Sequence, residues 1–430
     1  MAPHALHPTP QRQRPLSVFL SIAWMAALLL PAKAAPAQTA PVPFKDEPHA
    51  YWTRPPVDAF TKLLANPNAN RFQTPAAPLQ TLQRILEALD IPVHSQLLVY
   101  SATSLQSGLI HPTNPRALYF NEEAYVGYVP GGRFEIASID PQIGPIFYVS
   151  TAEAAPIQFG RTPRCMNCHA DRASEQLPGL VAESVIVTPT GASLDGFRRD
   201  QVGHHIPLAD RLGGWHVTGS MEHGPHLGNL AGQSQPGGYR KIANPPGSQF
   251  PWSNYLVQTS DLLPHLLHEH QLGFHNLVTL ALYRTREALQ TGNGSILPQD
   301  EAPLREIAHR IVRYLLFADE TPLPPDGFSP LESYKTAFLS RRIPTQTGLS
   351  LRDLDLKSRL FKFRCSYMIY TPSFRALPQP MLARIRTKLF EALGETPTQP
   401  EFAYLPPDEK RTIRAILAET NALPTESRKD

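Results

Sequence analysis

The pattern of hydrophobic and polar positions divides the chain into two regions of different character. Between Thr81 and Leu89 the apolar residues recur at i, i+3, i+4 and i+7, which predicts an amphipathic helix that Ile91-Pro92 ends. From Gln96 onward the pattern changes to short apolar or alternating runs that are rich in Tyr, Phe and Val. Such runs are typical of strands. Strands are therefore predicted at 97–100, 117–129, 133–139, 146–149 and 181–187.

The second half of the chain shows the longer spacing that is typical of helices. Ser260-Asp261 offers an N-cap for a helix that continues to about Leu289. Further helices are predicted at 303–317, 351–363, 380–393 and 408–419. We therefore expect an α+β fold, with a β-rich N-terminal half and a mainly α-helical C-terminal half.

The N-terminus has the pattern of a secretory signal peptide. Arg12 and Arg14 precede an apolar stretch from Leu16 to Leu30, and Ala32-Lys33-Ala34 and Ala35-Pro36-Ala37 follow as cleavage sites of the A-x-A type. The apolar stretch is short for a stable membrane span. The sequence therefore predicts a periplasmic or otherwise exported protein, anchored in a membrane only if this segment stays uncleaved.

Composition and charge narrow the classes of partner. The chain has 40 Lys and Arg against 37 Asp and Glu, a formal charge of +3, with no block of one sign. This balance gives no indication of nucleic-acid binding. The chain contains 3 cysteines, too few for a disulfide scaffold.

Two of these cysteines belong to the most informative motif of the chain, Cys165-Met166-Asn167-Cys168-His169. It reads C-x-x-C-H, the attachment signature of c-type haem. Each thiol can form a thioether to the macrocycle, and the adjacent imidazole can bind the iron from the proximal side. We therefore predict one covalent haem c, bound by Cys165, Cys168 and His169. Pro163 predicts that the motif lies in a loop rather than inside a helix.

Two other interpretations of the motif stay open. Cys165 and Cys168 can form a redox-active or structural disulfide, with His169 as a bystander. A zinc site would need a second Cys/His pair, but only Cys365 remains, and its aromatic neighbours predict a buried, inert thiol. The small all-α cytochrome c module is a poor match, because here the motif follows a long β-rich region.

With the motif placed, the sequence predicts four regions. These are a signal peptide at 1–37, a lead segment and helix at 38–95, a β-rich haem c-binding region at 96–255, and a helical region at 256–430.

Several short segments around the motif resemble a set of uncharacterised exported bacterial proteins with a single c-type cytochrome motif. The segments include Pro115–Asn121, Tyr125–Gly132, Gly213-Gly214-Trp215, His226–Asn229 and Leu351–Asp355. The resemblance covers most of the chain after the signal peptide. It implies a cytochrome-like protein with one haem and supplies no reaction.

The second axial ligand of the haem iron would decide the chemistry. A Gly- and His-rich stretch at 203–247 follows the motif, and glycine permits close approach of the backbone. We expect His226 to be the distal ligand, with Met221 as the rival. Either ligand would give a saturated iron, whereas an open position permits O₂ or peroxide chemistry.

The predicted helix from Ser260 carries a second group of candidate ligands. At 100° per residue, His265, His268, Glu269 and His275 share one sector, whereas His270 points elsewhere. His268 and His275 are separated by about 10.5 Å of helical rise, too far for one ion without outside ligands. The pattern therefore favours a polar interdomain or haem-facing surface over a second metal site.

These observations lead to three expectations for function. The first is single-electron transfer by a periplasmic monohaem cytochrome-like protein with a redox partner protein. The second is a haem-dependent oxidoreductase, peroxidase- or oxidase-like, and the third is a haem-based sensor with an open distal site. Whether the protein is an enzyme stays open at this point; electron transfer is favoured because it requires only the attachment site and a saturated iron.

Overall fold

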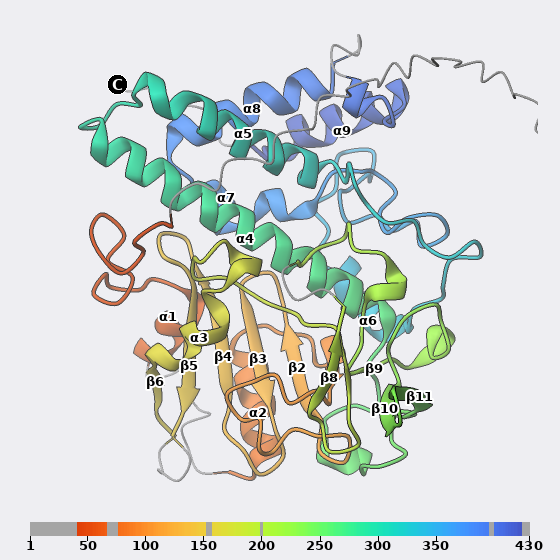
Figure 1. Cartoon of the computed structure of the whole chain (residues 1–430). Coiled ribbons are helices and arrows are strands. Elements are labelled where there is room, and N and C mark those ends of the chain that lie inside the picture. Colours follow the sequence, from red (N-terminus) through yellow and green to blue (C-terminus); the bar gives the residue numbers. More distant parts are fainter. Residues whose placement is uncertain (1–40, 67–75, 152–156, 198–200, 395–399, 424–430) are drawn as a thin grey trace, which may run out of the picture. The chain divides into compact units, whose positions relative to one another are not determined.

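The strands of the N-terminal half assemble into one antiparallel sheet. The computed structural model describes residues 41–66, 76–151, 157–197, 201–394 and 400–423, and the predicted signal peptide lies outside these residues. The sheet has seven strands in the order β6-β5-β4-β3-β2-β1-β9 (Figure 1). Its strands are β1 (Leu97–Val99), β2 (Arg116–Phe120), β3 (Ala124–Tyr128), β4 (Glu135–Asp140), β5 (Gly144–Ser150), β6 (Phe159–Arg161) and β9 (Trp215–His216).

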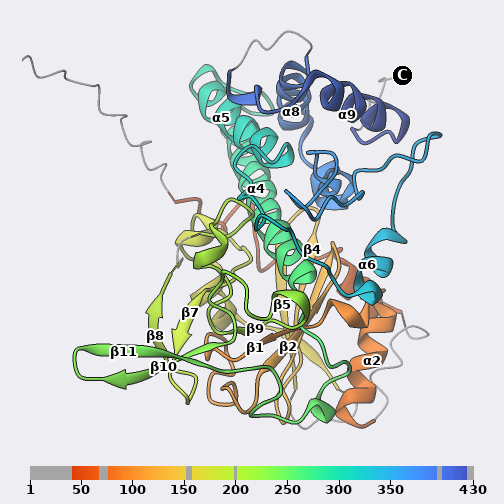
Figure 2. The same cartoon turned by 90° about the vertical axis from the view of Figure 1, so that its right-hand side faces the viewer.

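Two small hairpins accompany the sheet. β7 (Val185–Val187) pairs with β8 (Ser193–Gly196), and β10 (Leu230–Gln235) pairs with β11 (Gly238–Ala243). Figure 2 shows the β10–β11 hairpin extending away from the sheet. The predicted strand at 181–187 is therefore confirmed only in its last part.

Helices α1 (Ala59–Ala65) and α2 (Pro78–Ala88) belong to the N-terminal half. Asp58 caps α1, since its side chain accepts hydrogen bonds from the backbone amides of Phe60 and Thr61. The amide of Phe60 also lies 3.3 Å from the hydroxyl of Ser138 on β4. In α2 the apolar residues Leu82, Ile85 and Leu86 are buried, which confirms the predicted amphipathic helix.

The C-terminal half is helical, as predicted. Its helices are α4 (Leu262–Thr291), α5 (Pro298–Leu315), α6 (Glu332–Leu339), α7 (Pro372–Arg375), α8 (Gln379–Ala392) and α9 (Pro407–Glu419). Helix α4 contacts β5 as well as α5, α6, α7 and α8. Its residues are buried almost throughout from Leu262 to His275, so α4 is the central element of the core.

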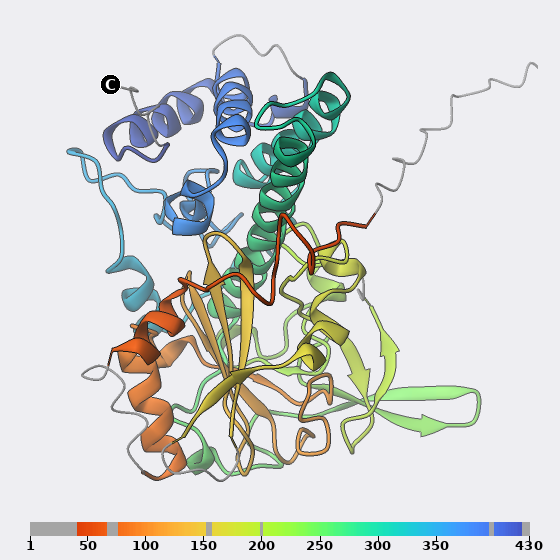
Figure 3. The same cartoon turned by 90° about the vertical axis from the view of Figure 1, so that its left-hand side faces the viewer.

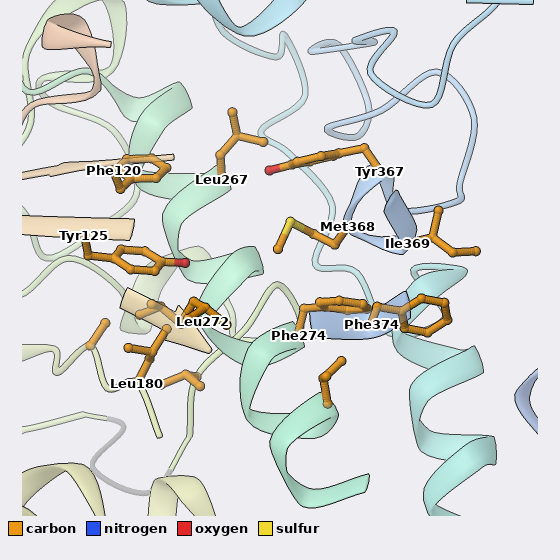
Figure 4. Packing of buried hydrophobic residues seen from close by; sticks show 14 of the residues in the cluster. Phe120, Tyr125, Leu180, Leu267, Leu272, Phe274, Tyr367, Met368, Ile369 and Phe374 are labelled. Atoms are coloured by element: carbon orange, nitrogen blue, oxygen red, sulfur yellow. The ribbon is translucent and has the colours of Figure 1, made fainter. Parts of the chain in front are cut away.

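The two sides of α4 contact different layers. Figure 4 shows Phe120, Tyr125 and Leu272 on the side of the sheet, and Phe274, Met368 and Phe374 on the other side. All of these side chains belong to one continuous core. The residues from Pro41 onward accordingly form one compact unit. The boundaries at 95/96 and 255/256 stay sequence predictions.

One predicted helix is wrong. Residues 351–363 form turns, with an isolated bridge between Leu354 and Phe361. The side chain of Asp355 accepts hydrogen bonds from the amides of Lys357 and Ser358, and Leu356 has a φ of +62°. Such local bonds compete with a helical hydrogen-bond ladder, which explains why the apolar spacing alone misled.

The observed architecture is mixed, with a sheet-rich first half and a helical second half, and the α+β prediction is confirmed at that level. Among the helices in the described ranges, none combines the length and apolar character needed to cross a membrane.

Candidate functional site

The C-x-x-C-H residues lie on a short turn that directly follows the edge strand β6. A 3-10 turn at Pro163–Cys165 leads into α3 (Met166–His169). Thr162 caps the 3-10 turn through a hydrogen bond from the amide of Arg164, and Pro163 occupies the first position, where no amide donor is needed. The motif therefore forms one helical turn rather than the predicted loop. This turn brings residues three apart in sequence to one side.

The motif residues line a cavity of about 370 Å³. Cys165, Cys168 and His169 form part of its wall, and the apolar residues Leu180 and Leu272 form another part. A volume of a few hundred cubic ångströms is typical of small-molecule and cofactor sites.

One face of the sheet forms the floor of this cavity. Strands β2 to β5 contribute two cross-strand rows of lining residues, in keeping with the period of two along a strand. The rows are Leu118, Gly127, Glu135 and Val149, and then Tyr125, Ala137 and Phe147. Gly127 and Ala137 have the smallest side chains of these rows and therefore leave space above the sheet for the cavity. Figure 3 shows α2 on the opposite face of the sheet from α3.

The imidazole of His169 contacts a backbone carbonyl and an aromatic ring. Its Nδ1 lies 2.9 Å from the carbonyl oxygen of Gly179, and its ring centroid lies 4.0 Å from that of Phe147. If Nδ1 donates to this carbonyl, Nε2 carries the lone pair that a metal needs. Burial lowers the pKa of His169 to about 4, so the ring is neutral at pH 7. Neutral imidazole with an outer hydrogen bond is the usual state of a metal-ligating histidine.

The surroundings of the two thiols raise their pKa values, whereas thiol exchange depends on lowered ones. Burial raises the pKa of Cys165 to about 11, and the charge of Glu135 adds to the effect. Burial also raises the pKa of Cys168, together with Glu183 and Asp171. Reactive dithiols depend on a lowered thiol pKa. The raised pKa values disfavour thiolate exchange chemistry, whereas a structural disulfide between Cys165 and Cys168 stays an open interpretation.

One ion pair interrupts the apolar wall of the cavity. Nη1 of Arg116 lies 2.9 Å from Oε2 of Glu135, and each side chain is 17% exposed. The Nε of Arg116 and the Oε1 of Glu135 are buried and have no hydrogen-bond partner in the structure. A guanidinium in this position is suited to bind a carboxylate.

The two predicted distal ligands contact each other. The Nε2 of His226 lies 2.7 Å from the carbonyl oxygen of Met221, and Nδ1 of His226 accepts a hydrogen bond from the amide of Gly228 at 3.0 Å. Both ring nitrogens of His226 are thereby engaged by the backbone of its own loop. Neither His226 nor Met221 is among the residues that line the cavity of the motif.

The predicted histidine face of α4 is divided among several partners. Of this face, His268 lines the cavity. Nε2 of His265 lies 3.0 Å from the carbonyl oxygen of His216, and Nε2 of His275 lies 3.0 Å from that of Glu122. Glu269 forms a buried ion pair with Arg211 at 3.4 Å. The four residues therefore do not share one site.

His270 points elsewhere, as the helical periodicity predicts. Its Nδ1 lies 2.8 Å from Nδ1 of His204, and its Nε2 lies 2.7 Å from the hydroxyl of Ser366. Within the ranges that the structure describes, no group of three or more His, Cys, Asp or Glu side chains is arranged to hold a metal ion.

Sequence reasoning did not identify Arg116, Glu135 or Trp215 as residues of the site, although all three line the cavity. The alternation along β2 and β4 was the available signal, because it puts Arg116 and Glu135 on the same face as Leu118 and Ala137. Comparison of the chain with protein-family models, with curated proteins and with solved structures gives no match.

Proposed function

We propose that this protein is an exported, monohaem c-type cytochrome-like protein that transfers single electrons. The observation that carries the proposal is the contact between Nδ1 of His169 and the carbonyl oxygen of Gly179, next to two cysteines that line the same cavity. A metal-ligating histidine characteristically makes this outer contact to a backbone carbonyl or a carboxylate. An isolated redox disulfide has no need of it.

The residues of the cavity fit a haem in three respects. Cys165 and Cys168 provide the two thiols for the thioethers, and His169 provides the imidazole for the iron. The apolar residues of the floor and walls would provide a surface for the macrocycle. Arg116 pairs with Glu135 through Nη1, and its buried Nε, which has no hydrogen-bond partner, would be the donor for a propionate carboxylate. A c-type haem bound there supplies a one-electron iron couple.

Electron transfer is supported by the position of the motif at the surface. Cys168 is exposed, whereas part of the cavity behind it is lined by buried aromatic and aliphatic side chains. A partner protein can therefore approach the exposed turn while the interior keeps a low dielectric constant, which is a determinant of the reduction potential. The proposed location is the periplasm or another exported location, with a redox partner protein there. Membrane anchoring applies only if the segment at 1–37 is not cleaved.

Covalent attachment is the first test. The full chain is produced together with a haem-attachment system, denatured and stained for haem on a gel. We expect one haem per chain in the wild type and none after combined Cys165→Ser and Cys168→Ser substitution. Cys365→Ser is the matched control, because Cys365 is fully buried away from the cavity, and it should keep the haem. Wild-type protein without covalent haem would falsify the proposal.

Electron transfer needs a second test, because covalent haem is also compatible with an oxidoreductase or a sensor. A potentiometric titration of the purified protein should give a reversible one-electron wave. Carbon monoxide should leave the spectrum of the reduced protein unchanged. A prompt spectral shift with carbon monoxide would instead support an open distal site, and the oxidoreductase or sensor function would replace electron transfer.

A further inference from the structure

We propose that His268 of α4 is the second axial ligand of the haem whose first ligand is His169. This inference rests on the proposed function and makes it more specific, since it names the residue that would occupy the second axial position of the iron. His268 and His169 are the two histidines among the residues that line the cavity. His268 is 5% exposed and lies one helical turn before Leu272, which lines the same wall.

Three aromatic rings hold the imidazole of His268 in place. Its centroid lies 5.2 Å from that of Phe120, 5.7 Å from that of Tyr125 and 6.1 Å from that of Trp215. Tyr125 and Trp215 also line the cavity. Two of the three rings beside His268 therefore belong to the wall of the same cavity that the motif lines.

The aromatic rings around His268 are themselves fixed by hydrogen bonds. The hydroxyl of Tyr125 donates to Oε1 of Gln271 at 3.1 Å, and Nε2 of Gln271 donates to the hydroxyl of Tyr367 at 2.9 Å. Nε1 of Trp215 donates to the carbonyl oxygen of Glu183 at 2.8 Å. A ligand whose neighbours are held in this way is pre-organised for binding, because little conformational freedom is lost when the bond forms.

The other candidate ligands do not line the cavity of the motif, and the histidines among them contact other parts of the chain. Both ring nitrogens of His226 contact backbone atoms of its own loop. His265 is directed to the carbonyl oxygen of His216, and His270 is directed to His204 and Ser366. Met368 and Met381 are fully buried in the core of the helical half and do not line the cavity.

Ligation by two histidines has consequences for the chemistry. Two histidine ligands generally give a lower reduction potential than a histidine and a methionine, and a saturated iron excludes O₂ and carbon monoxide. His268 would therefore make the protein an electron carrier of comparatively low potential rather than an oxidase or a gas sensor.

The test compares His268→Ala with His226→Ala in the full chain carrying its haem. We expect both variants to keep covalent haem on a denaturing gel. His268→Ala should change the low-spin optical and paramagnetic resonance spectra to high-spin, gain carbon monoxide binding, and return to low-spin with added imidazole. His226→Ala should retain the wild-type spectra. An unchanged low-spin spectrum in His268→Ala, or a loss of low-spin character in His226→Ala alone, overturns the inference.

His268→Met tests the same assignment if the alanine variant misfolds, because methionine has a volume similar to that of histidine. We expect a sulfur-to-iron charge-transfer band and a raised reduction potential. An unchanged potential in a folded His268→Met protein overturns the assignment. If the wild type lacks covalent haem, the proposed function itself fails, whereas covalent haem with ligation that is insensitive to residue 268 removes only the axial ligand.

Discussion

The Nδ1 of His169 and the carbonyl oxygen of Gly179 lie 2.9 Å apart, and this contact connects the C-x-x-C-H turn to the segment at Gly179. The next residue, Leu180, is held by Asn276 of α4 through two bonds. Its amide donates to Oδ1 of Asn276 at 2.8 Å, and its carbonyl oxygen accepts from Nδ2 of Asn276 at 2.8 Å. The long central helix thereby positions the backbone that contacts the imidazole of His169.

Gly179→Ala should disturb this connection without touching a haem-binding side chain. A Cβ at residue 179 would lie 2.2 Å from Cβ of Ser174 and 2.9 Å from Oδ1 of Asn276, so the backbone must move. We expect a loss of roughly 1–3 kcal/mol in the free energy of unfolding. A partial shift of the haem spectrum toward high-spin should accompany it, because the outer hydrogen bond of His169 is lost.

Denaturant unfolding and optical spectra of the purified protein measure these two effects. Gly160→Ala is the matched control, since a Cβ there meets no atom within 4 Å. Identical stability and spectra in Gly179→Ala and wild type would show that the Gly179 carbonyl does not orient His169.

Ala137→Leu should fill the cavity from its floor. Ala137 lies in the same cross-strand row as Tyr125 and Phe147, and all three line the cavity. A leucine there occupies space that the macrocycle needs, while the C-x-x-C-H motif stays intact. We expect the variant to fold but to carry a much smaller fraction of covalent haem, measured as haem per protein. Ala415→Leu, at an exposed position of α9, adds the same volume elsewhere and should keep full haem content. Full attachment in Ala137→Leu would place the macrocycle outside this cavity.

The fold was largely predictable because the local patterns agree with it. Short apolar runs, enrichment in Tyr, Phe and Val, and the alternation at 133–139 predicted strands between Leu97 and Val149, and the spacing of Leu82, Ile85 and Leu86 predicted α2. The failure at 351–363 arose where Asp355 bonds to the backbone and outweighs apolar spacing. Secondary structure follows local preference until a side chain offers the backbone a competing hydrogen bond.

Of the candidate site, the sequence identified the C-x-x-C-H residues directly. The motif is contiguous in sequence, so Cys165, Cys168 and His169 could be named at once. The Gly- and His-rich stretch after the motif favoured His226, but both ring nitrogens of His226 contact the backbone of its own loop. His268 lies about a hundred residues after the motif, and only the packing of α4 against the sheet brings it to the cavity. Helical periodicity had placed His268 on one face with His265, Glu269 and His275, but it could not show which of these residues lines the cavity.

The ion pair of Arg116 and Glu135 gives a prediction about stability. Arg116→Leu leaves the carboxylate of Glu135 without its cation in a mostly buried position. Removal of one partner of such a pair is more costly than removal of both. We expect Arg116→Leu to lower the free energy of unfolding by roughly 1–3 kcal/mol, a range reduced for the remaining exposure of the pair.

The double variant Arg116→Leu, Glu135→Leu should recover part of that loss. Denaturant unfolding of the two single variants and the double variant forms a mutant cycle that isolates the pairwise energy. Purely additive losses would indicate that the two side chains act independently. If Arg116 also binds a propionate, its substitution should in addition shift the reduction potential of the haem.

His49 gives a prediction for the pH dependence of stability at a position distant from the motif in sequence. It is fully buried, and its ring stacks on Tyr283 at 4.4 Å. Burial lowers the pKa of His49 to about 4 from the ordinary 6.5, and the charges of Arg286, Arg54 and Arg284 act in the same direction. Between these two pKa values the unfolded chain binds a proton that the folded chain does not bind.

Because the unfolded state binds more protons in this window, stability falls as the pH is lowered from 6.5 to 4. Protonation linked to His49 lowers the free energy of unfolding by roughly 2–3 kcal/mol at the acid end of the window. His49→Phe keeps the stacked ring and removes the titration, so its free energy of unfolding should decline less steeply over this range. Denaturant unfolding at half-unit pH steps measures the slope, and His223→Phe, at an exposed histidine, is the control that should follow the wild type. Parallel slopes in His49→Phe and wild type would mean that His49 does not contribute to the acid sensitivity of the fold.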